Sequence, residues 1–377
     1  MADQDGRQQL PIRSNPDPDI ESFDIVTTYH RLLSDDPDLT VPIATIEALI
    51  EALGASSATT AFETMKLVEA QSDRLAKSPS VANPMAVRHG SDFFKQYLVR
   101  ELRKFPSGGG AGSGSASDDQ DQQFVGIRNH LLRNARLFAT RAKDAREKIA
   151  AAGRHLIEDE SIVLTHGGSR VVGTLLSRAA ERGVDGDARR RFKVVYAVSE
   201  TRQAESNKIV SMLRAKGVPV ATIAEGSVAH VMANVDLVLV GAEAITAQGG
   251  IISRLGTYQL AKLAQADNKP FCVAAELHKL GQTFPEDQFH FNCRQFKQRL
   301  LEFYTEKKPE DGLVQVGNPY YKGNPADDTE DEKKARETQS ATPLDFTPPE
   351  LIASFICDEG VLSTVAMEHK VIDMFVS

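Results

Sequence analysis

Polar and glycine residues that could hold a phosphate follow three β-rich runs in the second half of the chain. The first group starts with a threonine-histidine pair and two glycines, then leads into a helical pattern whose free amides and positive end attract anions. Arginines in all three groups could bind phosphate oxygens through paired hydrogen bonds. The candidate ligand residues are Thr165, His166, Gly167, Gly168, Ser169 and Arg170, then Glu200 and Arg202, and finally Glu243, Ser253 and Arg254.

Each of these side chains, taken alone, has a plainer explanation as a turn cap or a surface ion pair. Their convergence at one edge of a sheet favours a site for a small anionic ligand. Neither a GxGxxG dinucleotide fingerprint nor a GxxxxGK[ST] phosphate loop occurs, so the sequence supports neither an NAD site nor a P-loop nucleotide site. We expect no metal and no resident cofactor, and we expect Cys272, Cys293 and Cys357 to be free thiols because they lack metal-type spacing.

Short β-rich runs alternate with helical stretches from residue 161 onward. Strand, helix, strand at this spacing indicates right-handed parallel crossovers, and ligands bind at the carboxyl ends of such strands. The sequence therefore predicts a Rossmann-like α/β domain over residues 153–377, with its densest motif in residues 234–264 and a turn at 248–250. The expected strands span residues 162–165, 192–198, 218–223, 236–242 and 271–276, and the expected helices lie near 169–181, 203–216, 226–233 and 256–267.

The first part of the chain predicts an all-helical domain over residues 21–152, because its apolar residues recur at spacings of three and four. Seven basic residues on its last helix, from Arg128 to Lys148, fit a solvated face better than a nucleic-acid site. The polar start, residues 1–20, and two insertions, residues 107–123 and 324–339, are expected to be disordered or flexible. The expected helices are two within residues 23–54, one from residue 56 or 57 to 75, one over 92–105 and one over 123–152.

Composition narrows the function further. The 377 residues carry a formal net charge of −8, which argues against sequence-independent binding of nucleic acid. No apolar run approaches the roughly 18 residues of a membrane span, and the start of the chain is too polar for a signal peptide. We therefore expect a cytosolic protein without a membrane partner.

Several segments resemble the family that unites methylthioribose-1-phosphate isomerase, ribose-1,5-bisphosphate isomerase and the alpha, beta and delta regulatory subunits of eukaryotic translation initiation factor 2B. The resemblance covers the C-terminal domain almost completely and the helical domain more loosely. Within the family, the segment DDPDLTVPIATIEALIEAL and the lack of a long basic extension are typical of the alpha branch. The other similar segments are THGGSRVVGTLL, VSETRQAESNK, VDLVLVGAEAITAQGGIISRLGTYQLAKLA, NKPFCVAAE and TPLDFTPPELIASFICDEGVLS.

The resemblance implies that the chain is not an enzyme. In the isomerases a cysteine follows the threonine-histidine pair and an aspartate follows a glycine-alanine pair, whereas this chain has Gly167 and Glu243 there. Glycine cannot transfer a proton. Ser253-Arg254 replaces an asparagine-lysine pair that helps to hold substrate phosphate, so a sugar phosphate or nucleotide monophosphate could still bind. The alternatives are a working isomerase that uses Glu243 with His166, and a sugar-phosphate sensor without a translational partner.

The resemblance also implies a regulatory subunit of the guanine-nucleotide-exchange factor for translation initiation factor 2. Such a subunit forms a homodimer, assembles with the beta, gamma, delta and epsilon subunits, and helps to sense factor 2 phosphorylated on its alpha subunit. Residues 343–363, where we expect an apolar helix after Pro343 and Pro348, correspond to the dimer interface of the family. Thr45 and Glu47 are the candidates for the surface that meets the phosphorylated partner.

Overall fold

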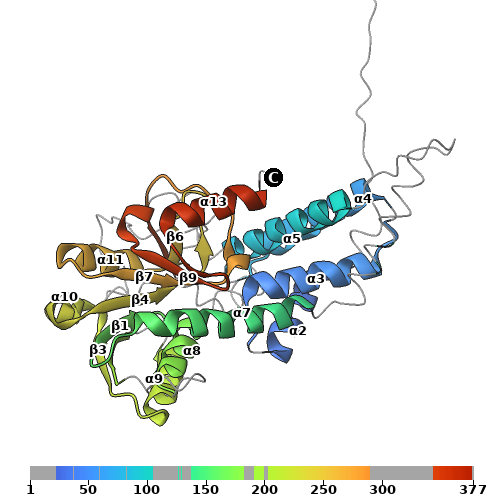
Figure 1. The fold of residues 1–377 in the computed structure, drawn as a ribbon. Coiled ribbons are helices and arrows are strands. Elements are labelled where there is room, and N and C mark those ends of the chain that lie inside the picture. The colour runs from blue at the N-terminus through green and yellow to red at the C-terminus, as the bar shows by residue number, and fades with distance from the viewer. Residues whose placement is uncertain are drawn as a thin grey trace, which may run out of the picture.

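The protein is described by a computed structural model that covers residues 23–104 except 37, 59 and 82, residues 126 and 129, and residues 137–181, 191–198, 203–288 and 343–375. A helical domain precedes an α/β domain with a mostly parallel sheet, as the sequence predicts (Figure 1). Among the described residues, none of the helices has the length and apolar character needed to cross a bilayer. Residues 1–20, 107–123 and 324–339, together with Glu200 and Arg202, lie outside the described ranges.

The helical domain is built around α3, which is buried along most of its length. Helices α2, α4, α5 and α7 all pack against other helices of this domain, and Ile46, Leu49 and Phe94 are fully enclosed in its core. Local signals fix the helix starts: Asp24 caps α2, and Thr60 forms a reciprocal capping box with Glu63 at the start of α4. The helices are α2 (Ile25–Asp35), α3 (Val41–Ala55), α4 (Ala61–Lys77), α5 (Pro84–Lys104) and α7 (Leu137–Gly153).

Two helix starts differ from the prediction. Helix α5 begins at Pro84 rather than near residue 92, because the Asn83 side chain accepts a hydrogen bond from the Ala86 amide at 3.0 Å and Pro84 fits the first helical position. Helix α4 begins at Ala61 rather than at residue 56 or 57, because the capping box of Thr60 and Glu63 sets its first residue.

A seven-stranded sheet forms the centre of the α/β domain, in the order β10-β9-β7-β4-β1-β2-β3. Every neighbouring pair in it is parallel except β9 and β10. All five predicted strands are confirmed, as are the helices near 169–181, 203–216 and 256–267. The strands are β1 (Ile162–His166), β2 (Lys193–Val198), β3 (Val220–Ala224), β4 (Leu237–Gly241), β7 (Phe271–Ala274), β9 (Ser354–Cys357) and β10 (Gly360–Leu362).

The side of the sheet to which the chain adds new strands changes between β1 and β4, which are themselves parallel. Strands β2 and β3 continue to one side of β1, whereas β7 and β9 continue to the other side of β4. Crevices that bind ligands open at such a switch point, at the carboxyl ends of the two strands. The helices of this domain are α8 (Arg170–Ala179), α9 (Gln203–Ala215), α10 (Val228–Val231), α11 (Thr257–Ala266) and α13 (Thr364–Phe375), and short 3-10 turns η3 (Glu225–Ser227) and η4 (Met232–Asn234) flank α10.

The prediction of an apolar helix within residues 343–363 is wrong. This segment forms β8 (Leu344–Thr347), a single 3-10 turn η8 (Pro349–Leu351), then β9 and β10. Strand β8 joins β5 (Ala244–Ile245) and β6 (Ile251–Arg254) in a second, antiparallel sheet. Pairing with β6 and β7 buries Phe346 and Phe355, and this distant pairing outweighs the local helical pattern.

Helix α7 connects the two domains. It packs against α3 at its beginning and against α8, β9 and β10 further along, where Ile149 and Ala150 join the apolar layer on one face of the sheet (Figure 1). Gly153, its last residue, sits so close to α8 that a Cβ atom there would lie 2.3 Å from Leu175 Cδ1. This close approach fixes how the helical domain is placed over the carboxyl edge of the sheet.

Candidate functional site

A cavity of about 800 Å³ lies between the two domains at the β1–β4 switch point. The α/β domain contributes the turn after β1, the start of α8, the end of β4 and part of β6. The helical domain contributes the segment between α2 and α3, the start of α5 and one side of α7. Of the sequence-predicted residues, those that line the cavity are His166, Gly167, Gly168, Ser169, Arg170, Glu243, Ser253 and Arg254.

The turn after β1 depends on two consecutive glycines. Gly167 and Gly168 have φ of +82° and +70°, a left-handed conformation that other residues adopt at a cost. Ser169 then caps α8 by accepting a hydrogen bond from the Val172 amide at 3.4 Å. Apart from its chain neighbours, the only heavy atom of the described residues within 4 Å of a Cβ built at Gly167 would be Arg254 Cδ, at 3.7 Å, so position 167 faces the cavity toward Arg254.

His166 and Thr165 are both buried residues at the end of β1. The His166 ring nitrogen Nε2 lies 2.9 Å from Thr257 Oγ1, and burial followed by the charge of Arg254 lowers the pKa of His166 to about 4. The imidazole is therefore neutral at neutral pH and lines the cavity as a polar wall. Thr165 is a buried residue of β1 in register with Tyr196, and it does not line the cavity.

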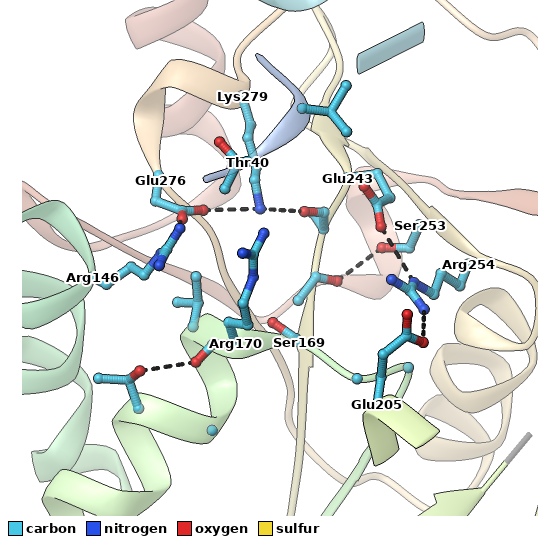
Figure 2. A pocket seen from close by; sticks show the side chains of 18 of the residues that line it. Thr40, Arg146, Ser169, Arg170, Glu205, Glu243, Ser253, Arg254, Glu276 and Lys279 are labelled. Carbon is cyan, nitrogen blue, oxygen red and sulfur yellow. Dashed lines mark hydrogen bonds and ion pairs between the residues drawn. The ribbon is translucent and has the colours of Figure 1, made fainter. Parts of the chain in front are cut away.

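Arg254 lies between two carboxylates at one end of the cavity (Figure 2). Its Nε is 3.3 Å from Glu243 Oε1, and its Nη1 is 3.6 Å from Glu205 Oε2. Asn83 donates a hydrogen bond to the other oxygen of Glu243 at 3.3 Å. Ser253 is buried and donates to the carbonyl oxygen of Gly241 at 2.8 Å. This end presents oriented carboxylate and amide groups, which suit the hydroxyls of a sugar.

Three cations gather at the other end of the cavity around one buried carboxylate, Glu276. Arg146 Nε lies 3.4 Å from Glu276 Oε1, and Lys279 Nζ lies 2.9 Å from Glu276 Oε2. Arg170 donates through both terminal nitrogens to the carbonyl oxygen of Leu39 at 3.4 Å. Figure 2 shows the charged ends of the three cations turned toward one another, well apart from Arg254. We call Arg146, Arg170 and Lys279 the cationic cluster.

The charged groups at this end of the cavity change one another's pKa values. Burial raises the pKa of Glu276, but the positive charge of Lys279 and further neighbours outweighs burial and holds the pKa well below its usual range, so the carboxylate is ionised. Desolvation and then the charge of Arg146 lower the pKa of Arg170. An anion placed here would be attracted by a locally positive, largely desolvated wall.

The sequence missed Arg146, Glu276 and Lys279 as site residues. The prediction of a solvated face is wrong for Arg146, because only 10% of its side chain is exposed and it pairs with Glu276. Lys143 on the same helix also lines the cavity. One local signal indicates this end of the cavity: Glu276 is a carboxylate that directly follows the buried run Phe271–Ala275.

The prediction that Thr45 and Glu47 form a partner surface is wrong for this chain. Thr45 has no exposed surface, and its hydroxyl donates to the carbonyl oxygen of Val41 at 2.9 Å. Glu47 is 6% exposed. Both side chains are buried because α3 is the central helix of its domain.

Within the described ranges, no three histidine, cysteine or acidic residues come together as metal ligands. Cys272 and Cys357 are buried free thiols, as predicted. Cys293 lies outside the described residues.

The Initiation factor 2 subunit family matches residues 35–364 of the chain. Translation initiation factor eIF2B subunit alpha from Dictyostelium discoideum is 27% identical over 358 residues, covering 94% of this chain and 98% of that protein. The protein of the same name from Caenorhabditis elegans is 24% identical over 353 residues, with coverages of 93% and 98%. Ribose 1,5-bisphosphate isomerase from Archaeoglobus fulgidus is 34% identical over 154 residues, which is 41% of this chain and 47% of the isomerase.

Solved structures share the fold. The crystal structure of eIF2B beta from Chaetomium thermophilum superposes with a TM-score of 0.59 at 17% identity, over 94% of both chains. The tetrameric eIF2B-beta2-delta2 complex from C. thermophilum gives 0.58 at 17% identity, again over 94% of both chains. The architecture of a helical domain followed by an α/β domain is therefore shared along nearly the whole chain.

Proposed function

The chain belongs to the initiation factor 2 subunit family, and we propose that it is the alpha regulatory subunit of eIF2B, the guanine-nucleotide-exchange factor for translation initiation factor 2. The observation that carries this proposal is the alignment with two alpha subunits over 98% of their lengths. Ribose 1,5-bisphosphate isomerases align over smaller shares of this chain, 41% for the A. fulgidus protein and 64% for the one from Pyrococcus furiosus. A regulatory subunit of this kind would act in the cytosol.

The proposal includes the absence of isomerase catalysis. Gly167 stands where the isomerases carry a cysteine, and it offers no side chain to the open space in front of Arg254. Glu243 stands where they carry an aspartate, and its two oxygens contact Arg254 and Asn83. Proton transfer during isomerisation needs an acid and a base within hydrogen-bond reach of the sugar. Glycine removes one of these two groups.

We propose that the cavity still binds a small phosphorylated molecule, either a sugar phosphate or a nucleotide monophosphate. The volume of about 800 Å³ is within the range of ordinary ligand sites. Carboxylate and amide groups at one end and cations at the other suit a ligand with hydroxyls and an anionic group. The ligand would act as a stabilising or regulatory effector rather than as a substrate.

Assembly is the second part of the proposal. We propose a homodimer that joins the beta, gamma, delta and epsilon subunits into the larger complex. Apolar side chains exposed on the edge strand β10 and on α13 support a self-association face: Val361 is 45% exposed, Val365 60% and Ile372 46%. The helical domain would contribute to sensing factor 2 phosphorylated on its alpha subunit, through residues other than the buried Thr45 and Glu47.

Mass spectrometry of the proteins that co-purify with the tagged chain from its own cells at low salt tests the proposed function. We expect the other eIF2B subunits and initiation factor 2. Recovery of the chain without them would contradict the proposal. In that case, turnover of methylthioribose 1-phosphate and ribose 1,5-bisphosphate, with Glu243→Gln as the inactive control, would test the isomerase alternative.

A further inference from the structure

We propose that Ser78 is a phosphorylation site for a proline-directed protein kinase, and that phosphate on Ser78 draws the Arg74 side chain away from the start of α2. Arg74 lies in the last turn of α4 and Ser78 directly follows that helix, and neither residue lines the cavity. The proposal does not depend on what the cavity binds. It adds a covalent signal to the domain that is proposed to help sense factor 2.

The chain has three serine or threonine residues that directly precede a proline, which is the recognition pair of proline-directed kinases. They are Ser78, Thr342 and Thr347. Thr347 is fully buried in β8, and Thr342 lies outside the described residues. Ser78 is partly exposed, and Pro79 and Ser80 after it are exposed. In the described part of the chain, Ser78 is therefore the one hydroxyl of this kind that a kinase can reach.

The backbone at Ser78 is already extended. Its φ and ψ are −64° and 131°, because the ring of the following proline disfavours the helical region for the residue before it. Helix α4 therefore ends at Lys77, and residues 78–81 form a turn in which the Val81 amide donates to the Ser78 carbonyl oxygen at 3.3 Å. Ser78 and Pro79 can enter a kinase cleft with little change in their own conformation.

Phosphorylation changes the hydrogen bonds of Ser78 directly. The γ-phosphoryl group of ATP transfers to Ser78 Oγ as its bond to ADP breaks, and the hydroxyl proton passes to the base of the kinase. In the unmodified chain, Ser78 Oγ lies 3.0 Å from Ser80 Oγ, which lies 2.8 Å from His30 Nε2 on α2. Phosphate oxygens only accept hydrogen bonds, so the Ser80 hydroxyl would donate to the phosphate instead of to His30.

Arg74 is the cation that the phosphate would recruit. It precedes Ser78 by four residues, a spacing that places two side chains on the same side of a helix. Its Nη1 now donates to a neutral acceptor, the Phe23 carbonyl oxygen, at 2.9 Å. A phosphoserine carries a charge of about −1.5 to −2, and its hydrogen bonds to guanidinium are about twice as strong as neutral ones. Lys77 already pairs with Asp73 at 2.9 Å.

The start of α2 would lose a partner when Arg74 moves. Asp24 caps this helix, and hydrogen bonds from Thr27, with a smaller effect of the Arg74 charge, lower the pKa of Asp24. Recruitment of Arg74 removes the hydrogen bond to Phe23 and the positive charge near the cap. The first turn of α2 should then open more often. Because α2 packs against α3 and α4, the modification would alter the outer side of the helical domain.

Kinase treatment of the full chain tests the modification. The chain is incubated with ATP and a cyclin-dependent kinase or, separately, a mitogen-activated kinase, and mass spectrometry should locate phosphate on Ser78. Ser78→Ala should abolish incorporation in this turn, and Pro79→Ala should lose most of it. The matched variant Ser80→Ala should be modified as the wild type is. Thermal unfolding establishes that the three variants are folded.

Hydrogen exchange tests the role of Arg74. Phosphorylation should speed exchange of the amides in the first turns of α2 by about threefold or more, the loss of roughly one hydrogen bond. Arg74→Met should show the same acceleration without phosphate, and phosphorylation should add little to it. Lys77→Met is the matched control from the same turn, and its α2 amides should exchange as in the wild type.

Three results would overturn the proposal. Absence of phosphate on Ser78 of the full chain with both kinases would refute the site, and a peptide of residues 71–86 treated in parallel shows whether the fold or the sequence prevents modification. Phosphate on Ser80 in place of Ser78 would refute recognition through the proline. Phosphorylated Ser78 with unchanged exchange in α2 would refute the recruitment of Arg74. The co-purification test of the subunit role is separate from all three.

Discussion

Arg146 of helix α7 and Glu276 after strand β7 form a buried ion pair between the two domains, with Nε and Oε1 3.4 Å apart. The Arg146 side chain is 10% exposed and that of Glu276 is fully enclosed. The pair lies in the cavity wall as well as in the domain junction. The groups that would bind an anion are therefore the same groups that hold the two domains together.

Replacement of Glu276 by glutamine is expected to destabilise the fold. The amide cannot neutralise Arg146 and Lys279, which would remain close together and largely out of water. Breaking a buried pair typically costs about 3–5 kcal/mol, and we expect a loss of this order in urea unfolding. The control is Asp73→Asn, which breaks a surface pair with Lys77 and should change stability by less than about 0.5 kcal/mol. Equal effects of the two substitutions would contradict this role of Glu276.

Acidification is expected to destabilise the protein through three buried histidines. Burial lowers the pKa of His89, His166 and His278 to about 4, compared with about 6.5 in an unfolded chain. Between these values the unfolded state binds more protons, so their stabilising contribution is complete above about pH 6.5 and is lost as the pH falls toward 4. Denaturant unfolding from pH 7.5 to 4.5 measures this slope.

A variant at His89 tests the origin of that slope. His89 joins α5 to the α/β domain, with its Nε2 2.8 Å from Thr283 Oγ1. His89→Gln should lower stability at pH 7.5 but make the decline with acid shallower. His369→Gln, which replaces an exposed side chain, is the control for the substitution itself and should change the stability at pH 7.5 by less than about 0.5 kcal/mol. The same slope in His89→Gln as in wild type would exclude this histidine as a cause.

Asp345 is expected to act in the opposite direction. Burial raises its pKa to about 7 even though the Gly256 and Tyr258 amides donate to its Oδ2. Because the folded-state pKa lies above the unfolded value of about 3.9, the folded state binds more protons between pH 4 and 7, and the contribution of Asp345 to stability decreases as the pH rises. Asp345→Asn should therefore gain stability relative to wild type between pH 5.5 and 8. The same stability difference between Asp345→Asn and wild type at pH 5.5 and at pH 8 would contradict this role of Asp345.

Local signals in the sequence account for much of the fold. Runs such as Ile162–His166 are short, apolar and bounded by polar turns, so their strand state and their parallel order follow from spacing alone. The glycine pair at 167 and 168 and the Ser169 cap also act locally, and the sequence placed both correctly at the cavity. The start of α5 also has a local signal, since Asn83 caps the helix and Pro84 is its first residue, but the predicted start near residue 92 does not take this pair into account.

The remaining features depend on residues that are far apart in the chain. Strand β8 needs its pairing with β6, which a local pattern around Phe346 does not contain. In the sequence, Arg146 is one of several basic residues on a helix. Its partner Glu276 is far along the chain, and the two residues meet only in the folded protein. The local charge at each end of the cavity also depends on distant residues. Glu205, for example, lies beside Arg254 only in the folded chain.

Helix packing around Gly90 gives a further prediction. A Cβ atom there would lie 2.5 Å from the Pro42 carbonyl oxygen and 2.8 Å from Pro42 Cα, both of which are backbone atoms that cannot rotate away. Gly90→Ala should therefore push α5 from α3 and cost about 1–3 kcal/mol in urea unfolding. Gly226→Ala is the control, because in the described part of the chain no atom beyond its sequence neighbours lies within 4 Å of the added carbon. Similar stability of the two variants would show that the α3–α5 contact adjusts freely.

The exposed apolar face of β10 and α13 allows a direct test of self-association. If this face joins two copies, the wild-type chain should sediment at twice its mass of 41.2 kDa. Ile372→Lys places a charge that must lose its water in the middle of such an interface, and should shift the equilibrium toward monomer by at least tenfold. Phe62→Lys is the matched control, since Phe62 is 78% exposed but lies on α4 in the other domain, and this variant should stay dimeric. Sedimentation equilibrium distinguishes these outcomes, and a dimer that persists in Ile372→Lys would place the interface elsewhere on the chain.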